Sequence, residues 1–220
     1  FLKEPVLEPL TYDPIENSED IFETISRKDR MIHVPYQKYE SVIKLFEEAS
    51  KDDDVTHIKA VQYRVAKESR IMDALIDAAR AGKSVSVFIE VKARFDEEAN
   101  LRWGEKLEKA GAKVMYSFPG LKVHSKIAWI RRKEKNNYRT YAYLSTGNFN
   151  EDTAKVYSDL SLLTADKRIT EDVSKIFSFY LDNFKIGTYK SLVISPFYMR
   201  KKFVNLINKE IENAAECKEA

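Results

Sequence analysis

The sequence lacks the residues that hold small secreted proteins and metal-stapled domains together. It has one cysteine, Cys217, which lies in a charged tail, so a disulfide framework and a cysteine-based zinc site are both excluded. No apolar run reaches the roughly 18 to 20 residues that span a bilayer, and the start FLKEPVLEPL lacks the basic and apolar regions of a signal peptide. We therefore expect a cytoplasmic protein with no membrane span, for which peripheral membrane association stays open.

The sequence also has little glycine and proline, and its net charge is small. With 6 Gly and 6 Pro in 220 residues and no low-complexity tract, the chain is neither fibrous nor disordered. The 37 Lys and Arg nearly balance the 35 Asp and Glu, and a formal charge of +2 is too small for binding to nucleic acid through bulk charge. A hydrophobic content of 44% at this length is enough for a core. We expect a globular protein with no nucleic-acid partner, in which any anion site is local.

Helical and strand patterns alternate from residue 39 onward, which is typical of an α/β fold with a mixed or parallel sheet flanked by helices. Gly82 and Gly111 are placed as C-caps of two helices, and Asp96 as an N-cap. This part of the pattern contains two consecutive β-α-β units, which imply right-handed crossovers. The predicted elements are helices over 39–49, 69–81 and 96–110 and strands over 56–65, 84–91 and 112–117.

The second part of the chain is richer in strands. It begins after Pro119 and Gly120, and it contains a long helix that Asp166 is expected to cap. A charged stretch between two of its strands is predicted to be a hairpin loop. The predicted elements are strands over 122–131, 139–146, 157–164 and 191–195, the hairpin loop over 132–137 and the helix over 166–184.

The chain has three histidines, and one of them lies in a setting that suits chemistry. His33 precedes Val34-Pro35 and is expected to be a loop or edge residue, and His57 is expected at the surface, at the start of a strand. His124 lies in GLKVHSKIAWI, where a strand would place it on the same face as Lys126. An imidazole can attack phosphorus while a neighbouring ammonium neutralises a phosphate oxygen and favours the neutral imidazole. This pair predicts phosphate chemistry.

A second polar tract, STGNFN, ends the strand expected beside that of His124. Gly147 would let the backbone approach a ligand closely, and the amide groups of Asn148 and Asn150 could hold phosphate oxygens. Each tract alone is common, since Gly-Asn usually marks a turn. In this order the two resemble the His-x-Lys … Gly-(Ser/Asn)-x-Asn pattern of the phospholipase D superfamily, whose members act through a phosphohistidine. This comparison gives Lys126, Asn148 and Asn150 their predicted roles.

Longer tracts narrow the resemblance. AVQYRVAKESRIMDALIDAARAGKSVSVFIEVKARFDEEANLRW, GLKVHSKIAWI and YLSTGNFNEDTAKVYSDLSLLTAD resemble the polyphosphate kinases that autophosphorylate on histidine, and the similarity covers roughly 1–214. The resemblance implies a phospholipase D-like α/β fold that is one half of a two-half architecture. It also implies reversible transfer of the terminal phosphate of ATP to polyphosphate through a phosphohistidine at His124, with ATP/ADP and polyphosphate as partners and Mg²⁺ as the cofactor.

Three further residues take roles from this family resemblance. Arg64 and Arg94 match two arginines of the family's phosphate and Mg²⁺ site, where a planar guanidinium is better suited to grip phosphate oxygens than to ligate a cation. The alternative for each arginine is a surface salt bridge. Tyr157 matches a nucleotide-contacting tyrosine, and its alternative is an aromatic of the strand core. Asp159 either orients a catalytic group or is a surface carboxylate.

The resemblance also bears on domain organisation. Superfamily sites combine two similar halves, and this chain has one His-x-Lys copy, begins at Phe1 without an initiator Met, and ends in an element with no successor. We therefore expect the remainder of its own chain as a partner, little or no activity from this stretch alone, and pairing of two half-sites into a homo-oligomer as a hypothesis. The predicted division is a linker or end of a preceding domain over 1–30, a phospholipase D-like catalytic domain over 31–188, and the truncated start of a second such domain over 189–220.

Two other functions stay open at this point. One is a phosphodiesterase or nuclease of the same superfamily, in which His124 attacks a diester. Arg131 disfavours it, because the superfamily's hydrolases have Asp five residues after the Lys. The other is a non-catalytic module that binds a polyanion through the same cations.

Overall fold

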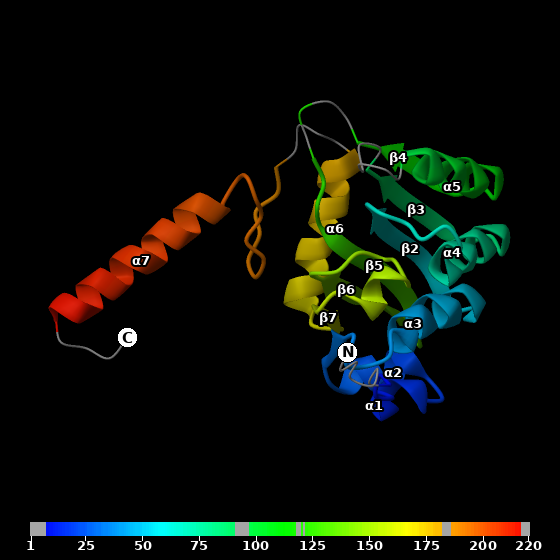
Figure 1. Cartoon of the computed structure of the whole chain (residues 1–220), viewed down its shortest axis with the longest axis horizontal. Helices are drawn as coiled ribbons and strands as arrows, with labels where there is room; N and C mark the ends of the chain where they lie inside the picture. The colour runs from blue at the N-terminus through cyan, green and yellow to red at the C-terminus, as the bar shows by residue number, and fades with distance from the viewer. Residues whose placement is uncertain (1–7, 91–96, 118–119, 121, 182–185, 217–220) are drawn as a thin grey trace, which may run out of the picture.

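The computed structural model describes residues 8–90, 97–117, 120, 122–181 and 186–216. Its centre is a seven-stranded mixed sheet in the order β1-β7-β6-β5-β2-β3-β4 (Figure 1). The neighbours β2, β3 and β4 are parallel, and every other pair of neighbours is antiparallel. The strands are β1 (Arg30–Val34), β2 (Val55–Gln62), β3 (Ser84–Ile89), β4 (Lys113–Tyr116), β5 (Lys126–Glu134), β6 (Asn137–Ser145) and β7 (Asp159–Thr164).

Side chains cap the starts of the helices α2 and α4. Ser69 Oγ accepts a hydrogen bond from the Met72 N–H at the start of α4, and Gly82, with a φ of 83°, follows its end. Asp20 accepts from the N–H groups of Phe22 and Glu23 in the same way. The helical elements are α1 (Asp13–Glu16), α2 (Ile21–Arg27), α3 (Glu40–Lys51), α4 (Arg70–Arg80), α5 (Glu97–Lys109), the 3₁₀ turn η1 (Thr153–Lys155), α6 (Lys167–Leu181) and α7 (Met199–Ala215).

Helices cover both faces of the sheet. The helices α1 to α5 pack on one face, where Ile58 and Ala60 of β2 enter the larger hydrophobic core. The helix α6 packs on the other face, where Phe177 contacts a smaller core that includes Val61 and Trp129 (Figure 1). Alternating β2 residues therefore serve opposite cores, as a strand covered on both faces requires. The predicted α/β class, with a mixed sheet between helices, is confirmed.

Residues before position 30 are packed into the larger core. Ile15, Ile21, Phe22 and Ile25 are each at most 2% exposed and belong to the same cluster as the apolar face of α3. Side chains from both sides of the predicted boundary at residue 30 therefore share one core. The division into 1–30, 31–188 and 189–220 stays a prediction.

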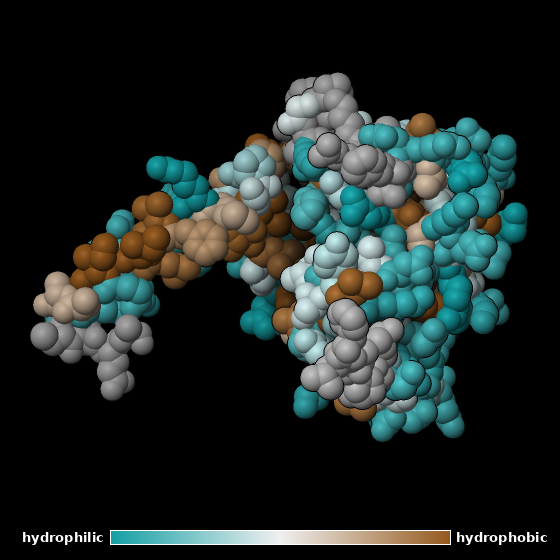
Figure 2. Space-filling view, in the orientation of Figure 1, coloured by the Kyte–Doolittle hydropathy of each residue, from teal (hydrophilic) through white to brown (hydrophobic). Residues whose placement is uncertain are grey.

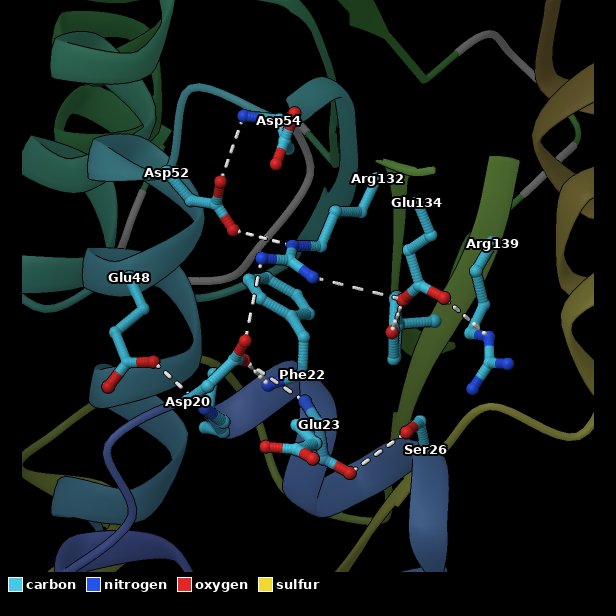
Figure 3. A network of polar contacts seen from close by, with 12 residues as sticks. Asp20, Phe22, Glu23, Ser26, Glu48, Asp52, Asp54, Arg132, Glu134 and Arg139 are labelled. Carbon is cyan, nitrogen blue, oxygen red and sulfur yellow. Dashed lines mark hydrogen bonds and ion pairs between the residues drawn. The ribbon is translucent and has the colours of Figure 1, made fainter. Parts of the chain in front are cut away.

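A network of charges joins this N-terminal part to the sheet (Figure 3). Arg132 of β5 lies 2.7 Å from the Asp52 carboxylate and 3.4 Å from the Asp20 carboxylate, and it also faces Glu134. Arg139 of β6 pairs with Glu134 at 3.0 Å. One arginine thus links the cap of α2, the end of α3 and the β5–β6 hairpin.

The predicted strand over 191–195 is wrong, because the backbone there bonds to a side chain instead of a sheet. Asp172 of α6 is 1% exposed, and its Oδ2 accepts hydrogen bonds from the N–H groups of Lys190, Ser191 and Leu192 at 2.7–3.1 Å. The helix α7 follows, has no buried residue, and extends away from the body with apolar side chains along it (Figures 1 and 2). Within the described residues, no helix is both long and apolar enough to cross a bilayer.

Candidate active site

Several of the polar residues singled out in the sequence, including His124, Lys126 and Gly147, lie at one end of the sheet within the described part of the chain. The strands β2 and β3 end there, β6 ends there, and β5 and β7 begin there. The pairing of Lys126 with Ser145, and of Ser145 with Ser161, fixes the order of the side chains along this edge. The edge holds the carboxyl ends of the parallel strands, where α/β proteins place their ligands.

His124 lies in the segment before β5 and not on the strand, so the predicted strand start at 122 is wrong. Its carbonyl accepts a hydrogen bond from Lys126 Nζ at 2.6 Å, and the preceding Val123 N–H bonds to the buried carboxylate of Glu90 at 2.9 Å. Ser125 Oγ bonds to the Tyr180 hydroxyl of α6 at 2.8 Å. Side chains bond to the Val123 N–H and to the His124 carbonyl, and the strand β5 begins only at Lys126. His124 and Lys126 still come together, for a reason other than strand alternation.

The His124 ring is exposed and its pKa is lowered. Partial burial of the ring, and then the positive charges of Lys126 and Lys122, disfavour the imidazolium. The ring packs edge-on against Tyr63, with the centroids 5.1 Å apart and the planes at 78°. The lowered pKa favours the neutral imidazole, whose lone pair a nucleophile needs, and the Tyr63 ring packs against it.

Lys126 is a buried cation beside this ring. Its side chain is 4% exposed, and burial lowers its pKa to about 8, although the charge of Asp159 acts in the opposite direction. The ammonium also lies 5.3 Å from the centroid of the Tyr63 ring. A cation that is poorly hydrated attracts an anion more strongly than a surface lysine does. An incoming phosphate would supply that anion.

Gly147 is required by its neighbour Asp159. A Cβ at position 147 would lie 2.5 Å from the Asp159 carboxylate, which is closer than real side chains approach. Thr146 Oγ1 donates to the same carboxylate at 2.7 Å. Asp159, whose role the sequence left between two alternatives, therefore fixes the loop after β6 and lies close enough to act on Lys126.

The two asparagines of STGNFN have different surroundings. Asn150 is 6% exposed, and its Oδ1 accepts the N–H groups of Asp152 and Thr153 at 3.1 and 2.9 Å, so it caps η1. The Asn148 Oδ1 is buried and, among the described atoms, has no hydrogen-bond partner. A buried acceptor in this condition is costly unless water or a ligand donates to it. Phosphate contact by either amide stays a prediction.

The structure describes two of the three remaining predicted site residues, Arg64 and Tyr157. Arg64 is half-buried and follows Tyr63 directly after β2, on the edge that carries His124. Arg94 lies outside the described residues. Tyr157 precedes β7 and is 60% exposed, so it is not an aromatic of the strand core, and its ring is open to a ligand.

The other two histidines have neighbours that explain them. His33 lies on the edge strand β1, as expected, and its Nε2 is 2.9 Å from Ser158 Oγ. The His57 Nδ1 lies 3.0 Å from an Arg131 Nη2. Arg131 is five residues beyond Lys126 on β5, about 16 Å along the strand. The arginine that replaces the hydrolases' Asp is thus engaged with a histidine away from the His124 edge.

Sequence patterns alone missed Tyr63, Glu90, Asn100 and Tyr180. Asn100 of α5 is fully buried, and its Nδ2 donates to the carbonyls of Tyr63 and Glu90 at 2.9 and 3.0 Å. The only sequence signal for Glu90 and Tyr63 was that a polar or aromatic residue follows an apolar strand. In the sequence, Tyr180 fits the apolar face of the helix that contains it; burial raises its pKa to about 12, and its hydroxyl shares a hydrogen bond with Ser125 Oγ in which either oxygen can donate.

A cavity of about 380 Å³ lies on the α6 side of His124. Its lining is mostly apolar and includes Phe179, Tyr180, Tyr189 and Phe197. The lining also contains Lys122 and His124, so this cavity borders the histidine ring.

Residues 20–186 match the family model described as "Polyphosphate kinase C-terminal domain 1". The chain belongs to the polyphosphate kinase family. The polyphosphate kinase of Vibrio vulnificus (strain YJ016) is 40% identical over 220 residues, which are 100% of this chain and 31% of that protein. That of Escherichia coli (strain K12) is 45% identical over 195 residues, 89% of this chain and 28% of that protein. The chain thus spans less than a third of the length of these polyphosphate kinases.

Solved structures agree with the family and the fold. The polyphosphate kinase of Porphyromonas gingivalis superposes with a TM-score of 0.87 and 44% identity, over 97% of this chain and 36% of that one. Nuc from Salmonella typhimurium, a phospholipase D family member, superposes with a TM-score of 0.54 over 74% of this chain and 99% of its own, at 14% identity. This second likeness shows the fold alone. The family resemblance and the phospholipase D-like fold that the sequence predicted are both confirmed.

The described residues do not fit direct ligation of the Mg²⁺ expected for a polyphosphate kinase. Within the part of the chain that the structure describes, no group of three or more His, Cys, Asp or Glu side chains could hold a metal ion. Arg64, which the resemblance links to the Mg²⁺ site, carries a positive charge and has no lone pair to offer. A guanidinium at this edge suits phosphate oxygens instead.

Proposed function

We propose that this chain supplies the His124 half of a polyphosphate kinase site, in which the terminal phosphate of ATP moves reversibly to polyphosphate. The observation that carries the proposal is the exposed His124 ring, whose pKa is lowered, two residues before the buried ammonium of Lys126, which bonds to the His124 carbonyl. A nucleophile for phosphorus must have a free lone pair, and the oxygens of the transferred group must meet positive charge. Both conditions are met within three consecutive residues.

The reaction has two balanced steps. In the first step, the lone pair of a His124 ring nitrogen attacks the γ-phosphorus in line, and the bond from that phosphorus to the bridging oxygen breaks, so ADP leaves with the electron pair. In the second step, a terminal oxygen of polyphosphate attacks the same phosphorus and the P–N bond breaks, which restores neutral His124. Lys126 and Arg64 neutralise the phosphate oxygens, and Arg94 is expected to join them. Most of the acceleration comes from this positioning and charge.

The proposed partners are ATP/ADP and polyphosphate. Tyr157 is 60% exposed beside the loop after β6 and is proposed to contact the nucleotide. Mg²⁺ is proposed to arrive on the ATP phosphates, which the two arginines grip. The rest of the site is proposed to come from further parts of the natural chain or from a second copy. The cytoplasmic location stays a prediction.

Phosphorylation of the full natural chain tests this proposal. The chain is incubated with γ-labelled ATP and Mg²⁺, and protein-bound label that is labile to acid and stable to base is measured. We expect label on the unaltered chain and on the control His57→Ala, and none on His124→Ala.

Other outcomes select the alternatives. Absence of label with intact polyphosphate binding would support the polyanion-binding module. Cleavage of a phosphodiester that depends on His124 would support the phosphodiesterase. The same assay on this stretch alone measures whether its half-site is self-sufficient.

A further inference from the structure

Glu90 is a buried carboxylate to which the reaction above gives no role. It directly follows β3, is 1% exposed, and accepts hydrogen bonds from described residues on both of its oxygens. Ser117 Oγ donates to Oε1 at 2.7 Å, and the Val123 N–H donates to Oε2 at 2.9 Å. A carboxylate is costly to bury unless hydrogen-bond donors surround it. The burial of Glu90 therefore indicates a structural role for its carboxylate.

The backbone of Glu90 is itself firmly held. Its N–H donates to the Gln62 carbonyl at 2.9 Å, and its carbonyl accepts from Asn100 Nδ2 at 3.0 Å. The same Asn100 amide donates to the Tyr63 carbonyl at 2.9 Å. The ends of β2 and β3 and the helix α5 are therefore tied together around Glu90. Its carboxylate is a fixed point next to a segment that belongs to no strand.

That segment carries His124. Val123, which is 3% exposed, gives its N–H to Glu90 one residue before the histidine. Beyond the histidine, Ser125 is held by Tyr180, and the His124 carbonyl is held by Lys126. We propose that Glu90 is a positioning residue that sets the place of the His124 ring through the Val123 N–H. This role rests on the proposed function of His124 as the nucleophile.

The physical basis is the narrow tolerance of an in-line attack. A displacement of about 1 Å costs on the order of 100-fold in rate. Without the Glu90 carboxylate, the Val123 N–H is a buried donor with no acceptor, and the segment must shift to find one. The effect falls on the rate of attack and not on ATP binding, because Glu90 points to the backbone of Val123 and is itself buried.

Three substitutions in the full natural chain separate this role from general packing. Glu90→Met keeps a similar volume and removes both acceptors. Glu90→Gln keeps an oxygen for the Val123 N–H, and its amide can donate to Ser117 Oγ, which is able to accept. Ser117→Ala removes the hydrogen bond that Ser117 Oγ donates to the carboxylate and leaves the bond from the Val123 N–H in place, which makes it the matched control.

The measurement is the single-turnover rate of phosphohistidine formation as a function of ATP concentration. We expect Glu90→Met to be slower by about 100-fold at saturating ATP, with half-saturation changed by less than about threefold. Glu90→Gln and Ser117→Ala should stay within about fivefold of the unaltered rate. A folded Glu90→Met chain that phosphorylates at the unaltered rate would overturn the proposal, as would a loss in Ser117→Ala equal to that in Glu90→Met.

Amide hydrogen exchange at Val123 gives a second readout that does not need ATP. Exchange should be slow in the unaltered chain, in Glu90→Gln and in Ser117→Ala, and fast in Glu90→Met. If Glu90→Met does not fold, 2-hydroxy-3-methylbutanoic acid at position 123, which keeps the valine side chain and replaces the backbone N–H by an ester oxygen, should give the same loss of rate. An unaltered rate with that ester would overturn the proposal. One further outcome separates the two proposals. If no chain forms phosphohistidine but amide exchange at Val123 follows the expected pattern, the assignment of His124 as the nucleophile fails, whereas the hydrogen bond from Val123 to Glu90 is supported.

Discussion

His124 and Lys126 need opposite protonation states for phosphoryl transfer. His124 must be neutral to attack, and the structure lowers its pKa through partial burial and two lysines. Lys126 must be charged to neutralise phosphate, and its pKa is lowered to about 8 by burial. The two groups are in their working states together only between the lowered pKa of His124 and about pH 8. Two neighbouring basic groups, each with a lowered pKa, thus define a pH interval of activity.

The alkaline limb of this interval is a prediction about Lys126. The single-turnover rate of phosphohistidine formation, measured from about pH 6 to about pH 10, should fall as pH rises through about 8. In Lys126→Arg the guanidinium stays charged, so we expect that fall to move to higher pH. An alkaline limb at the same pH in both chains would contradict the assignment.

The lowered pKa of Lys126 also determines the direction in which the free energy of unfolding changes with pH. Its pKa is lower in the folded chain than the ordinary value of 10.5, so the unfolded chain binds the proton more tightly. The free energy of unfolding contributed by this group therefore rises with pH between about 8 and 10.5. The burial of Lys126 costs stability at neutral pH, which is typical of a group kept for function.

At the scale of elements, side chains decide where strands stop and start. The strand predicted from 122 begins at Lys126, since Glu90 and Lys126 bond the backbone groups before it. The strand predicted at 191 is replaced by three N–H groups on Asp172. Burial alone would raise the pKa of Asp172, but these donors and Lys175 outweigh it and lower the pKa. A buried carboxylate thus takes the place of a neighbouring strand in each case.

Asp172 can be tested as the anchor of the segment after α6. In Asp172→Ala three backbone N–H groups lose their acceptor, and we expect a loss of about 2 kcal/mol in the free energy of unfolding. Amide exchange at positions 190 to 192 should become fast. The control Lys175→Met removes the ion pair at 3.1 Å and the hydrogen bond from Lys175 Nζ to the Thr188 carbonyl at 2.9 Å, but it leaves the three N–H groups on Asp172, and it should cost less than about 1 kcal/mol. Slow exchange at these amides in Asp172→Ala would disprove the anchoring role.

At the scale of the whole molecule, the described body is one three-layer unit that includes residues from position 15 onward. The sequence predicted a linker or the end of a preceding domain over 1–30, because three prolines break the local periodicity there. The apolar periodicity of the sequence does not show that Ile15, Ile21 and Phe22 share one hydrophobic core with α3. The helix α7 differs from the body, since it has no buried residue and Phe203, Ile207 and Ile211 are each more than half exposed (Figure 2).

The Arg132 network predicts that the first helices unfold with the body. Arg132→Met leaves the Asp20 and Asp52 carboxylates without their cation, and we expect a loss of about 1 to 3 kcal/mol in a single cooperative urea transition. The control Arg27→Met breaks an ion pair of α2 whose arginine is 72% exposed, and its effect should be close to zero. A separate early transition that involves residues 13 to 27 alone would show that the linker prediction was the better description.

The sequence by itself determined the order and type of most elements, the mixed sheet between helices, and the family. Apolar periodicity and caps such as Ser69 are local, and the tracts around His124 are specific enough to compare. Only the tertiary structure decided how His124 is held. Glu90 and Tyr180 lie 33 and 55 residues from their partners Val123 and Ser125. Whether a backbone N–H joins a strand or a distant carboxylate depends on which groups folding brings near, and no local pattern contains that information.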